Sequence, residues 1–429
     1  MRHFIDNNLS EKEREGLCQR PKMDFNTIFD DVNPIIEDVR RRGDAAIGHY
    51  SQKFDGISPV PLVIDPSEKE VDLDRETKQA IDTAFDNIYR FHKAQLPDPL
   101  EVETMPGVQC RRIARPIERV GLYIPGGTAM LPSTLMMLGI PAMLAGCKTI
   151  VAATPPQKNG SAADELIYIA QRIGVTHLLT SGGAQAVAGM ALGTSTVPKV
   201  DKILGPGNQY VTAAKMLLQN SDARIAIDMP AGSSEVLVIA DGSANPAFVA
   251  ADLLSQAEHG RDSQVVLLAT EAFDLPAFNQ AMNRQVEDLP RKTIVQQVIK
   301  QSFIVTVDTL KDAFHFSNRY APEHLIVQCD GAEEWQDHIM NAGSVFLGHW
   351  TPESAGDYAS GTNHTLPTYG YARMYSGVST DSFLKYITLQ QLTREGLKNL
   401  APAIGKLAEL EKLDAHRNAV SIRIKTMDS

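Results

Sequence analysis

Residues 119–127 read Arg-Val-Gly-Leu-Tyr-Ile-Pro-Gly-Gly, an apolar run that is closed by a proline and two glycines. A short run of this kind is typical of a buried strand that passes into a turn. Residues 132–145 follow as a long apolar stretch suited to a helix, so the sequence here indicates one strand–turn–helix unit. Repetition of such a unit predicts a parallel sheet, because parallel strands need a crossover connection between them.

The same alternation continues in two consecutive series. The first predicts strands at 120–124, 149–153, 177–180, 202–204 and 224–227, with helices at 132–145, 162–173, 184–192 and 208–218. The second predicts strands at 235–240, 264–269, 303–307, 325–328 and 344–347, with helices at 246–258, 308–317 and 333–342. Together they predict an α/β fold with two Rossmann-like, doubly wound domains, in which ligands bind beyond the carboxyl ends of the strands.

The regions on either side of these series are predicted to be helical. Residues 25–42 and 77–95 carry apolar side chains at helical spacing, and prolines between 97 and 106 mark a boundary. The C-terminal part is predicted to form helices at 382–395 and 400–413 and to end in 419–424. It is too short to hold its own core, so it must pack on the main body or on a partner subunit.

The 429 residues have an ordinary globular composition, with 43% hydrophobic and 22% charged residues. The net charge is −11 and no basic run is present, so we expect no nucleic-acid partner. No apolar stretch approaches the roughly 20 residues that span a bilayer, so we expect no membrane role. The four cysteines are scattered and the first ten residues lack a signal peptide's apolar core, which predicts a cytoplasmic location.

Three polar segments offer candidate metal ligands. Gln256 and His259 are three residues apart near the predicted end of a helix at Gly260, a spacing that places them on one face. A histidine beside a second donor suits zinc. Taken alone, however, a histidine at this position is better explained as a residue that caps the helix C-terminus.

The segment 352–364 is small, polar and interrupted by glycine, which favours a site-forming loop over a regular element. In this segment Asp357 is a candidate metal ligand, while Glu353 and His364 are candidates for binding a ligand. An exposed turn with surface carboxylates explains the segment about equally well. In the third segment, 411–418, His416 alone has the character of an ordinary surface histidine.

Glu323 and His324 are neighbours at the start of a predicted strand, directly after Pro322. Adjacent strand residues point to opposite faces unless the local geometry is broken, and the proline makes such a break plausible. An imidazole with a pKa near ~6.5 can take a proton from an alcohol, and a neighbouring carboxylate can orient it or activate water. For the pair alone, two solvent-exposed residues of an edge strand are the simpler explanation.

Glycine-rich loops follow three of the predicted strands, at 123–127, 181–185 and 205–208. Each loop precedes a helix, so its backbone amides are placed to face a phosphate. None contains the G-x-G-x-x-G fingerprint of dinucleotide binding, and tight turns explain the glycines equally well. The loops are therefore compatible with a dinucleotide without establishing one.

Read together and in this order, the segments resemble the histidinol dehydrogenase family over about residues 39–420. The most specific stretches are 120–127, 182–188, 205–208, 227–240, 253–260, 321–325 and 344–371. The resemblance implies one zinc per site, bound by Gln256, His259 and Asp357 and by His416 from the neighbouring subunit. Glu323 and His324 are implied to be the acid/base pair. The resemblance also implies that NAD is contacted by Tyr123, Gln185 and Asn208. It implies that the substrate is contacted by Ser234, Glu353, His364 and, from the neighbouring subunit, Glu411.

The implied reaction is the oxidation of L-histidinol through L-histidinal to L-histidine with two NAD, the last step of histidine biosynthesis. Zinc would hold the substrate's imidazole and amino nitrogens, His324 would remove the hydroxyl proton, and Glu323 would help water add to the aldehyde. The implied assembly is a homodimer with an intersubunit active site. The expected division is an N-terminal segment 1–20, a metal and acid/base domain of 21–122 with 236–378, an NAD domain of 123–235, and a swapped tail 379–429.

Three other functions compete with this interpretation. Within the family, an enzyme for another primary alcohol, such as a sulfonated propanediol, would change the residues that face the amine and imidazole. Glu353, His364 and Glu411 favour histidinol, whereas Ser233 and Arg261 stand where proline is common and 157–162 is an insertion. The alternatives from other classes are a zinc hydrolase, which would form no NADH, and a metabolite-binding protein, which would bind histidinol without turnover.

Overall fold

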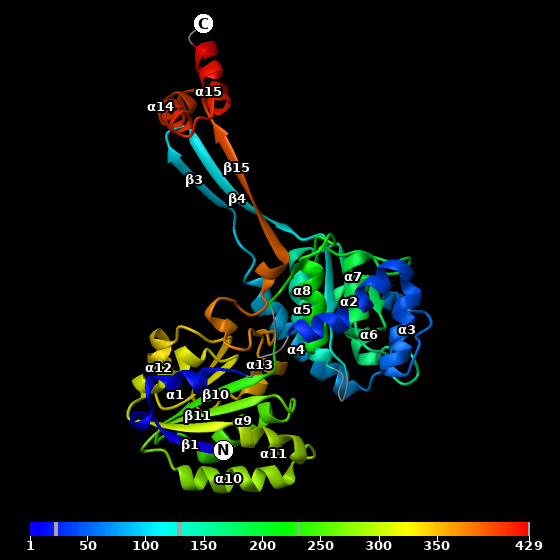
Figure 1. Ribbon diagram of the computed structural model, residues 1–429, viewed down its shortest axis with the longest axis vertical. Helices are drawn as coiled ribbons and strands as arrows, with labels where there is room; N and C mark the ends of the chain where they lie inside the picture. The colour runs from blue at the N-terminus through cyan, green and yellow to red at the C-terminus, as the bar shows by residue number, and fades with distance from the viewer. Residues whose placement is uncertain (21–24, 127–130, 230–231, 428–429) are drawn as a thin grey trace.

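The computed structural model describes residues 1–20, 25–126, 131–229 and 232–427, and in these residues the short apolar runs of the sequence form strands. Within these residues the strands build two six-stranded sheets and one three-stranded sheet. Each six-stranded sheet is the centre of an α/β domain, and the three-stranded sheet belongs to an arm that projects away from both domains (Figure 1). The prediction of two Rossmann-like domains is confirmed.

The first domain contains the parallel sheet β1-β12-β11-β10-β13-β14. Its strands are β1 (Arg2–Ile5), β10 (Glu235–Ala240), β11 (Gln264–Thr270), β12 (Phe303–Val307), β13 (His324–Gln328) and β14 (Ser344–Leu347). One face is covered by α9 (Pro246–Ala257), α10 (Leu275–Asp288) and α11 (Lys292–Gln301). The other is covered by α1 (Glu11–Cys18), α12 (Leu310–Tyr320) and the 3-10 helix η3 (Ala332–His338).

The second domain contains the sheet β2-β7-β6-β5-β8-β9, which is parallel except for the pairing of β2 with β7. Its strands are β2 (Val63–Ile64), β5 (Arg119–Tyr123), β6 (Thr149–Ala153), β7 (His177–Leu179), β8 (Lys202–Leu204) and β9 (Ala226–Ile227). One face packs on α4 (Arg75–Lys93), α5 (Pro132–Ala145) and α6 (Asp164–Ile173). The other packs on α2 (Phe25–Arg42), α3 (Asp44–Asp55), α7 (Gly183–Leu192) and α8 (Gln209–Gln219).

The predicted grouping of residues 21–122 with 236–378 is wrong for the residues that the structure describes. Helices α2, α3 and α4 bury their apolar faces on the second sheet, and β2 joins that sheet. The physical reason is that α9–α12 and α1 already cover both faces of the first sheet. The segment 1–20 is likewise part of the first domain, since β1 pairs with β12.

The arm combines the tail with an earlier part of the chain. Strand β15 (Leu384–Leu392) pairs antiparallel with β4 (Val108–Pro116), which pairs with β3 (Leu100–Met105). The predicted helix at 382–395 is therefore wrong: its β-branched and aromatic residues satisfy their backbone groups through β4, a partner distant in sequence. Two helices, α14 (Arg394–Leu410) and α15 (Asp414–Met427), complete the tip of the arm (Figure 1).

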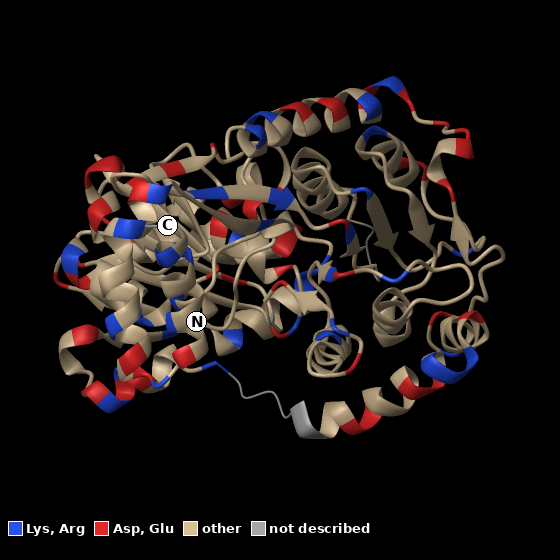
Figure 2. Cartoon of the chain, turned by 90° about the horizontal axis from the view of Figure 1, so that it is seen from above, with Lys and Arg blue, Asp and Glu red and all other residues tan. Residues whose placement is uncertain are grey.

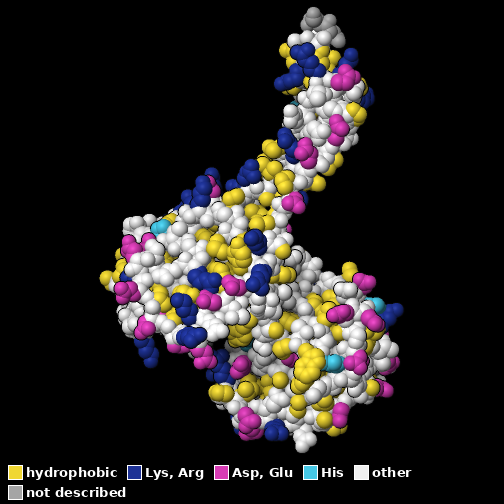
Figure 3. Space-filling view, turned by 180° about the vertical axis from the view of Figure 1, so that it is seen from behind, with side chains coloured by type: hydrophobic (Ala, Val, Ile, Leu, Met, Phe, Trp, Pro, Cys, Tyr) yellow, Lys and Arg dark blue, Asp and Glu magenta, His cyan; other side chains and the backbone are white. Residues whose placement is uncertain are grey.

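Apolar side chains are exposed along the arm (Figure 3). They are Leu100, Val102, Tyr386, Ile387, Leu389, Leu407, Leu410, Leu413 and Ile422. On the outer helices of the two domains, by contrast, charges of both signs are interspersed (Figure 2). Among the described residues, no helix is both long and apolar enough to cross a membrane.

Candidate active site

Helix α9 carries the first candidate ligands to the amino edge of the first sheet, where β10 and β13 begin. It begins with Asn245, which caps it by accepting from the amide of Ala247, and Pro246 takes the first helical position. The helix ends at Ala257, three residues before the predicted end at Gly260. Gln256 is therefore in its last turn and fully buried, while His259 lies just beyond it and is exposed.

A short helix, α13 (Glu353–Tyr358), holds the next two candidates. The sequence predicted an irregular loop here, and that prediction is wrong for these six residues. The helical backbone matters because Glu353 and Asp357 are one turn apart and so share a face. Glu353 is buried and accepts a hydrogen bond from the hydroxyl of Ser255 on α9 (3.1 Å).

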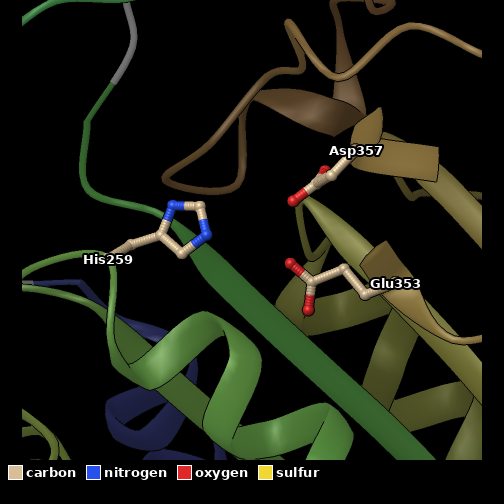
Figure 4. A group of neighbouring side chains, drawn as sticks. All are labelled: His259, Glu353 and Asp357. Atoms are coloured by element: carbon tan, nitrogen blue, oxygen red, sulfur yellow. The ribbon is translucent and has the colours of Figure 1, made fainter. Parts of the chain in front are cut away.

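These helices bring His259, Glu353 and Asp357 together (Figure 4). One potential ligand atom from each residue lies within 4.8 Å of those from the other two. An imidazole and two carboxylates are donors that zinc and other divalent ions accept. Of the four ligands expected from the resemblance, the structure places Gln256, His259 and Asp357 in this region, and it adds Glu353 to the donor set.

Buried polar atoms without partners show that the donor set fits a bound cation. Among the described residues, Gln256 Oε1, Glu353 Oε1 and His324 Nε2 are buried and accept or donate no hydrogen bond. Such atoms are costly to bury unless they are paired or bind a ligand or ion. Two of the three are oxygens beside the His259–Glu353–Asp357 cluster, so a divalent ion would satisfy them.

Glu323 and His324 meet in this site. Ala321, directly after α12, adopts a left-handed backbone (φ 53°), and β13 then begins at His324, between β10 and β14. The exposed fractions of Glu323 and His324 are 6% and 3%, so the exposed edge-strand explanation is wrong. Glu323 Oε2 lies 3.6 Å from His324 Nδ1, and His324 Nε2 lies 3.5 Å from Asp357 Oδ1.

The carboxylates around His324 determine its protonation. Burial lowers the pKa of His324, but the neighbouring carboxylates of Glu323, Glu353 and Asp357 outweigh burial and raise it well above its usual value. Burial also raises the pKa of Glu323, and it raises the pKa of Glu353 to about 8. The protein alone thus gathers more negative charge here than one imidazole can balance, which again suits a cation.

His364 connects the cluster to the second domain. Its Nδ1 lies 2.8 Å from the carbonyl oxygen of Asp357, and its Nε2 lies 3.1 Å from the hydroxyl of Thr134 on α5. The adjacent Asn363 donates to the carbonyl oxygen of Met137, also on α5 (2.6 Å). Ser234 directly precedes β10, and its carbonyl oxygen accepts from the amide of Gln264.

The three residues expected to contact NAD lie at the carboxyl edge of the second sheet. Tyr123 ends β5, and its hydroxyl accepts a hydrogen bond from the amide of Gly183 (2.9 Å). Gln185 on α7 is buried, and its Oε1 lacks a partner among the described residues. Asn208 caps α8 by accepting from the amides of Tyr210 and Val211. Gly127, the last residue of the first glycine loop, lies outside the described residues.

Glu411 and His416 lie elsewhere. Glu411 directly follows α14 and His416 is in α15, at the tip of the arm, away from α9 and α13 (Figure 1). Both are exposed. Within one chain, the site is therefore built without them.

Sequence reasoning missed the residues that support the site. Ser255 binds Glu353, Thr134 contacts His364, and the backbone of Glu235 contacts Gln256 and His324. Their side chains are ordinary, and the contacts depend on distant segments. A charged residue in the otherwise apolar strand 235–240 was the one available signal, because a buried strand seldom begins with glutamate.

Two Rossmann-like domains, with a buried Glu323–His324 pair at the amino edge of the first sheet and glycine-rich loops at the carboxyl edge of the second, are typical of an α/β enzyme of the dehydrogenase class. Comparison with known proteins identifies the family. The family model for histidinol dehydrogenase matches residues 18–424, so the chain belongs to the histidinol dehydrogenase family.

Relatives that match the whole of this chain agree with this family. The histidinol dehydrogenase, chloroplastic, of Oryza sativa subsp. japonica is 57% identical over 100% of this chain and 91% of its own. A histidine biosynthesis trifunctional protein of Neurospora crassa is 54% identical over 100% of this chain and 50% of its own. The crystal structure of histidinol dehydrogenase from Elizabethkingia anophelis superposes with a TM-score of 0.95 at 49% identity, covering 100% of this chain and 99% of the other.

Proposed function

We propose that this protein oxidises L-histidinol through L-histidinal to L-histidine with two NAD, the last step of histidine biosynthesis. The observation that carries the proposal is the position of His324, which lies between Glu323 and Asp357 and beside the metal-type donor cluster. Membership of the histidinol dehydrogenase family agrees with this chemistry. The contact of His364 with Thr134 supports a substrate site that faces the second domain.

Zinc is the proposed metal, with Gln256, His259 and Asp357 as the ligands from this chain. When bound, zinc would hold the substrate's imidazole and amino nitrogens, and its charge would lower the pKa of His324 toward a value suited to accepting a proton. The partnerless Gln256 Oε1 supports its inclusion beside the His259–Glu353–Asp357 cluster. Glu353, with a second carboxylate from Glu411, suits the cationic amino group of the substrate.

His324 and Glu323 divide the proton transfers. In the alcohol step, His324 takes the hydroxyl proton while the carbon loses a hydride, which forms the aldehyde. In the aldehyde step, Glu323 takes a proton from water as its oxygen adds to the carbonyl carbon, and loss of a second hydride leaves the acid. The buried Glu323 has a raised pKa, as expected for a carboxylate that exchanges protons near neutral pH.

NAD is proposed to bind at the carboxyl edge of the second sheet, where it would accept each hydride. Tyr123, Gln185 and Asn208 lie there at the ends of three different strand-to-helix connections. Ligands bind at this edge in doubly wound sheets. Gln185, whose buried Oε1 lacks a partner, is free to accept a hydrogen bond from the cofactor.

The proposed assembly is a homodimer in which each arm reaches the partner's active site. Two properties of the chain support this. The arm exposes a row of large apolar side chains, which normally become covered by an interface. Its tip also carries Glu411 and His416, for which the single chain offers no site. A cytoplasmic location stays a prediction, because the relative from rice is chloroplastic.

The test is NADH formation from L-histidinol by the purified protein, before and after treatment with a chelator and again after zinc is restored. We expect two NADH for each histidinol, lost with the chelator and recovered with zinc. Absence of NADH despite bound zinc would reject histidinol and favour another primary alcohol, such as a sulfonated propanediol. Activity unaffected by full removal of zinc would reject the metal assignment.

A further inference from the structure

Arg20 and Glu235 form a buried ion pair that lies outside the proposed catalytic residues. Glu235 connects this ion pair to the proposed acid/base pair of Glu323 and His324. Arg20 Nε and Nη2 donate to the two carboxylate oxygens of Glu235, at 2.9 and 2.6 Å. The side chains of Arg20 and Glu235 are 6% and 2% exposed. A planar guanidinium that binds both oxygens of a carboxylate fixes its orientation as well as its charge.

Arg20 is itself held from two other directions. Its Nη1 donates to the carbonyl oxygen of Cys18 (2.7 Å), and the guanidinium carbon lies 3.4 Å from the ring centroid of Tyr320. Cys18 ends α1 and Tyr320 ends α12, so both neighbours belong to the helical layer of the first domain. The guanidinium therefore anchors Glu235 to that layer.

The backbone of Glu235 contacts the proposed catalytic residues. Its amide donates to Glu323 Oε2 (2.8 Å). Its carbonyl oxygen accepts from Gln256 Nε2 (3.3 Å) and lies 3.1 Å from His324 Nδ1. One peptide position thus contacts both members of the acid/base pair and a proposed metal ligand.

Glu235 is also a point where separate parts of the chain meet. Arg20 lies just before the passage to α2 in the second domain, and Glu235 begins β10 where the chain has returned from that domain. The amide of Tyr369, in the segment that leads toward the arm, donates to Glu235 Oε1 (2.9 Å). The carboxylate is consequently held by two segments that are distant from each other in the sequence.

We propose that Arg20 is a positioning residue that, through the carboxylate of Glu235, fixes the start of β10 against Glu323 and His324. The inference rests on the proposed function, in which those two residues transfer protons. Without Arg20, the buried carboxylate of Glu235 loses its counter-charge and its two-pronged contact, and it must move toward water. This movement shifts the peptide group that holds Glu323, and displacements of about 1 Å can cost about a hundredfold in rate.

The test compares Arg20→Met and Arg20→Lys with wild type, measuring kcat, the KM for L-histidinol, bound zinc and the melting temperature. The matched control is Arg14→Met, which breaks an arginine–aspartate pair in the same segment, between Arg14 and Asp6 (2.8 Å). We expect Arg20→Met to lower kcat about 10- to 100-fold with KM and zinc within about twofold of wild type. Lysine should restore part of kcat, because it keeps the charge but not the two-pronged contact, and the control should match wild type.

Three outcomes would overturn the inference. A kcat for Arg20→Met within about twofold of wild type would show that the ion pair does not position the site. Parallel losses of kcat, zinc and substrate affinity would show general damage to the fold. If Arg20→Met does not fold, the test uses Glu235→Gln, which keeps the side-chain volume. An unchanged kcat in Glu235→Gln would then overturn the inference. No NADH from wild type would instead overturn the proposed function, and the inference with it.

Discussion

His324 Nε2 lies 3.5 Å from Asp357 Oδ1, so the first residue of β13 faces a side chain one turn into α13. On the other side of the ring, Nδ1 lies 3.6 Å from Glu323 Oε2. The proposed acid/base pair and the proposed metal centre are therefore adjacent and share charge. A substitution in the pair is expected to alter the metal centre, and the reverse also holds. The metal content of each variant must therefore be measured together with its activity.

Replacing Glu323 with glutamine should impair oxidation of L-histidinal more than oxidation of L-histidinol. The amide cannot take a proton from water, whereas His324 can still take the hydroxyl proton of the alcohol. We expect a fall of roughly a hundredfold or more in the aldehyde step, measured as NADH formation with each substrate separately. Glu333→Gln, an exposed change on η3, is the control. Equal losses in both steps would reject the division of roles.

Replacing His416 with alanine should lower zinc content, and mixing this variant with His259→Ala should restore activity. In a mixed dimer, one of the two sites receives an intact His259 from one chain and an intact His416 from the other. The measurement is NADH formation after the two inactive proteins are unfolded and refolded together. Each variant refolded alone is the control. Verified mixed dimers without activity would reject the exchange of arms.

Replacing Gln185 with leucine should raise the KM for NAD and leave the KM for L-histidinol unchanged. The buried Oε1 has no partner among the described residues, so the cofactor is its expected donor. A hydrogen bond of about 1 kcal/mol corresponds to a rise of about fivefold. The control is Gln171→Leu on α6, whose amide binds the carbonyl oxygens of Pro66 and Lys69. An unchanged KM for NAD would remove Gln185 from the cofactor site.

Replacing Asp252 with asparagine should stabilise the protein at neutral pH. Burial raises the pKa of Asp252 to about 6, so the folded state keeps a proton that the unfolded state releases near pH 4. Wild-type stability therefore falls as the pH rises from about 4 to about 6, and the loss persists at pH 7. Asparagine removes this dependence, for a gain of roughly 1 to 3 kcal/mol.

The measurement for Asp252→Asn is urea unfolding at several pH values between 4 and 7. Exposed Asp262→Asn, in the loop after His259, is the matched control and should keep the slope of wild type. If Asp252→Asn showed the same dependence on pH as wild type, the carboxyl group would not be protonated in the folded state over this range.

The domains were predictable because their signals are local. Strands 149–153, 202–204, 235–240, 303–307 and 344–347 were predicted with the bounds that the structure has. Each is a short apolar run between turn residues, and burial on both faces of a parallel sheet requires that pattern. Strand β15 was predicted as a helix because its partner, β4, is far away in the sequence.

The sequence by itself determined the two α/β domains, the family and the candidate residues, since apolar periodicity and motif order are properties of neighbouring residues. Only the tertiary structure decided which residues meet. It placed Glu353 with His259 and Asp357, joined α2–α4 to the second sheet, and put Arg20 against Glu235. Such contacts depend on how sheet faces are covered and on which buried charges find partners, and no local pattern encodes either.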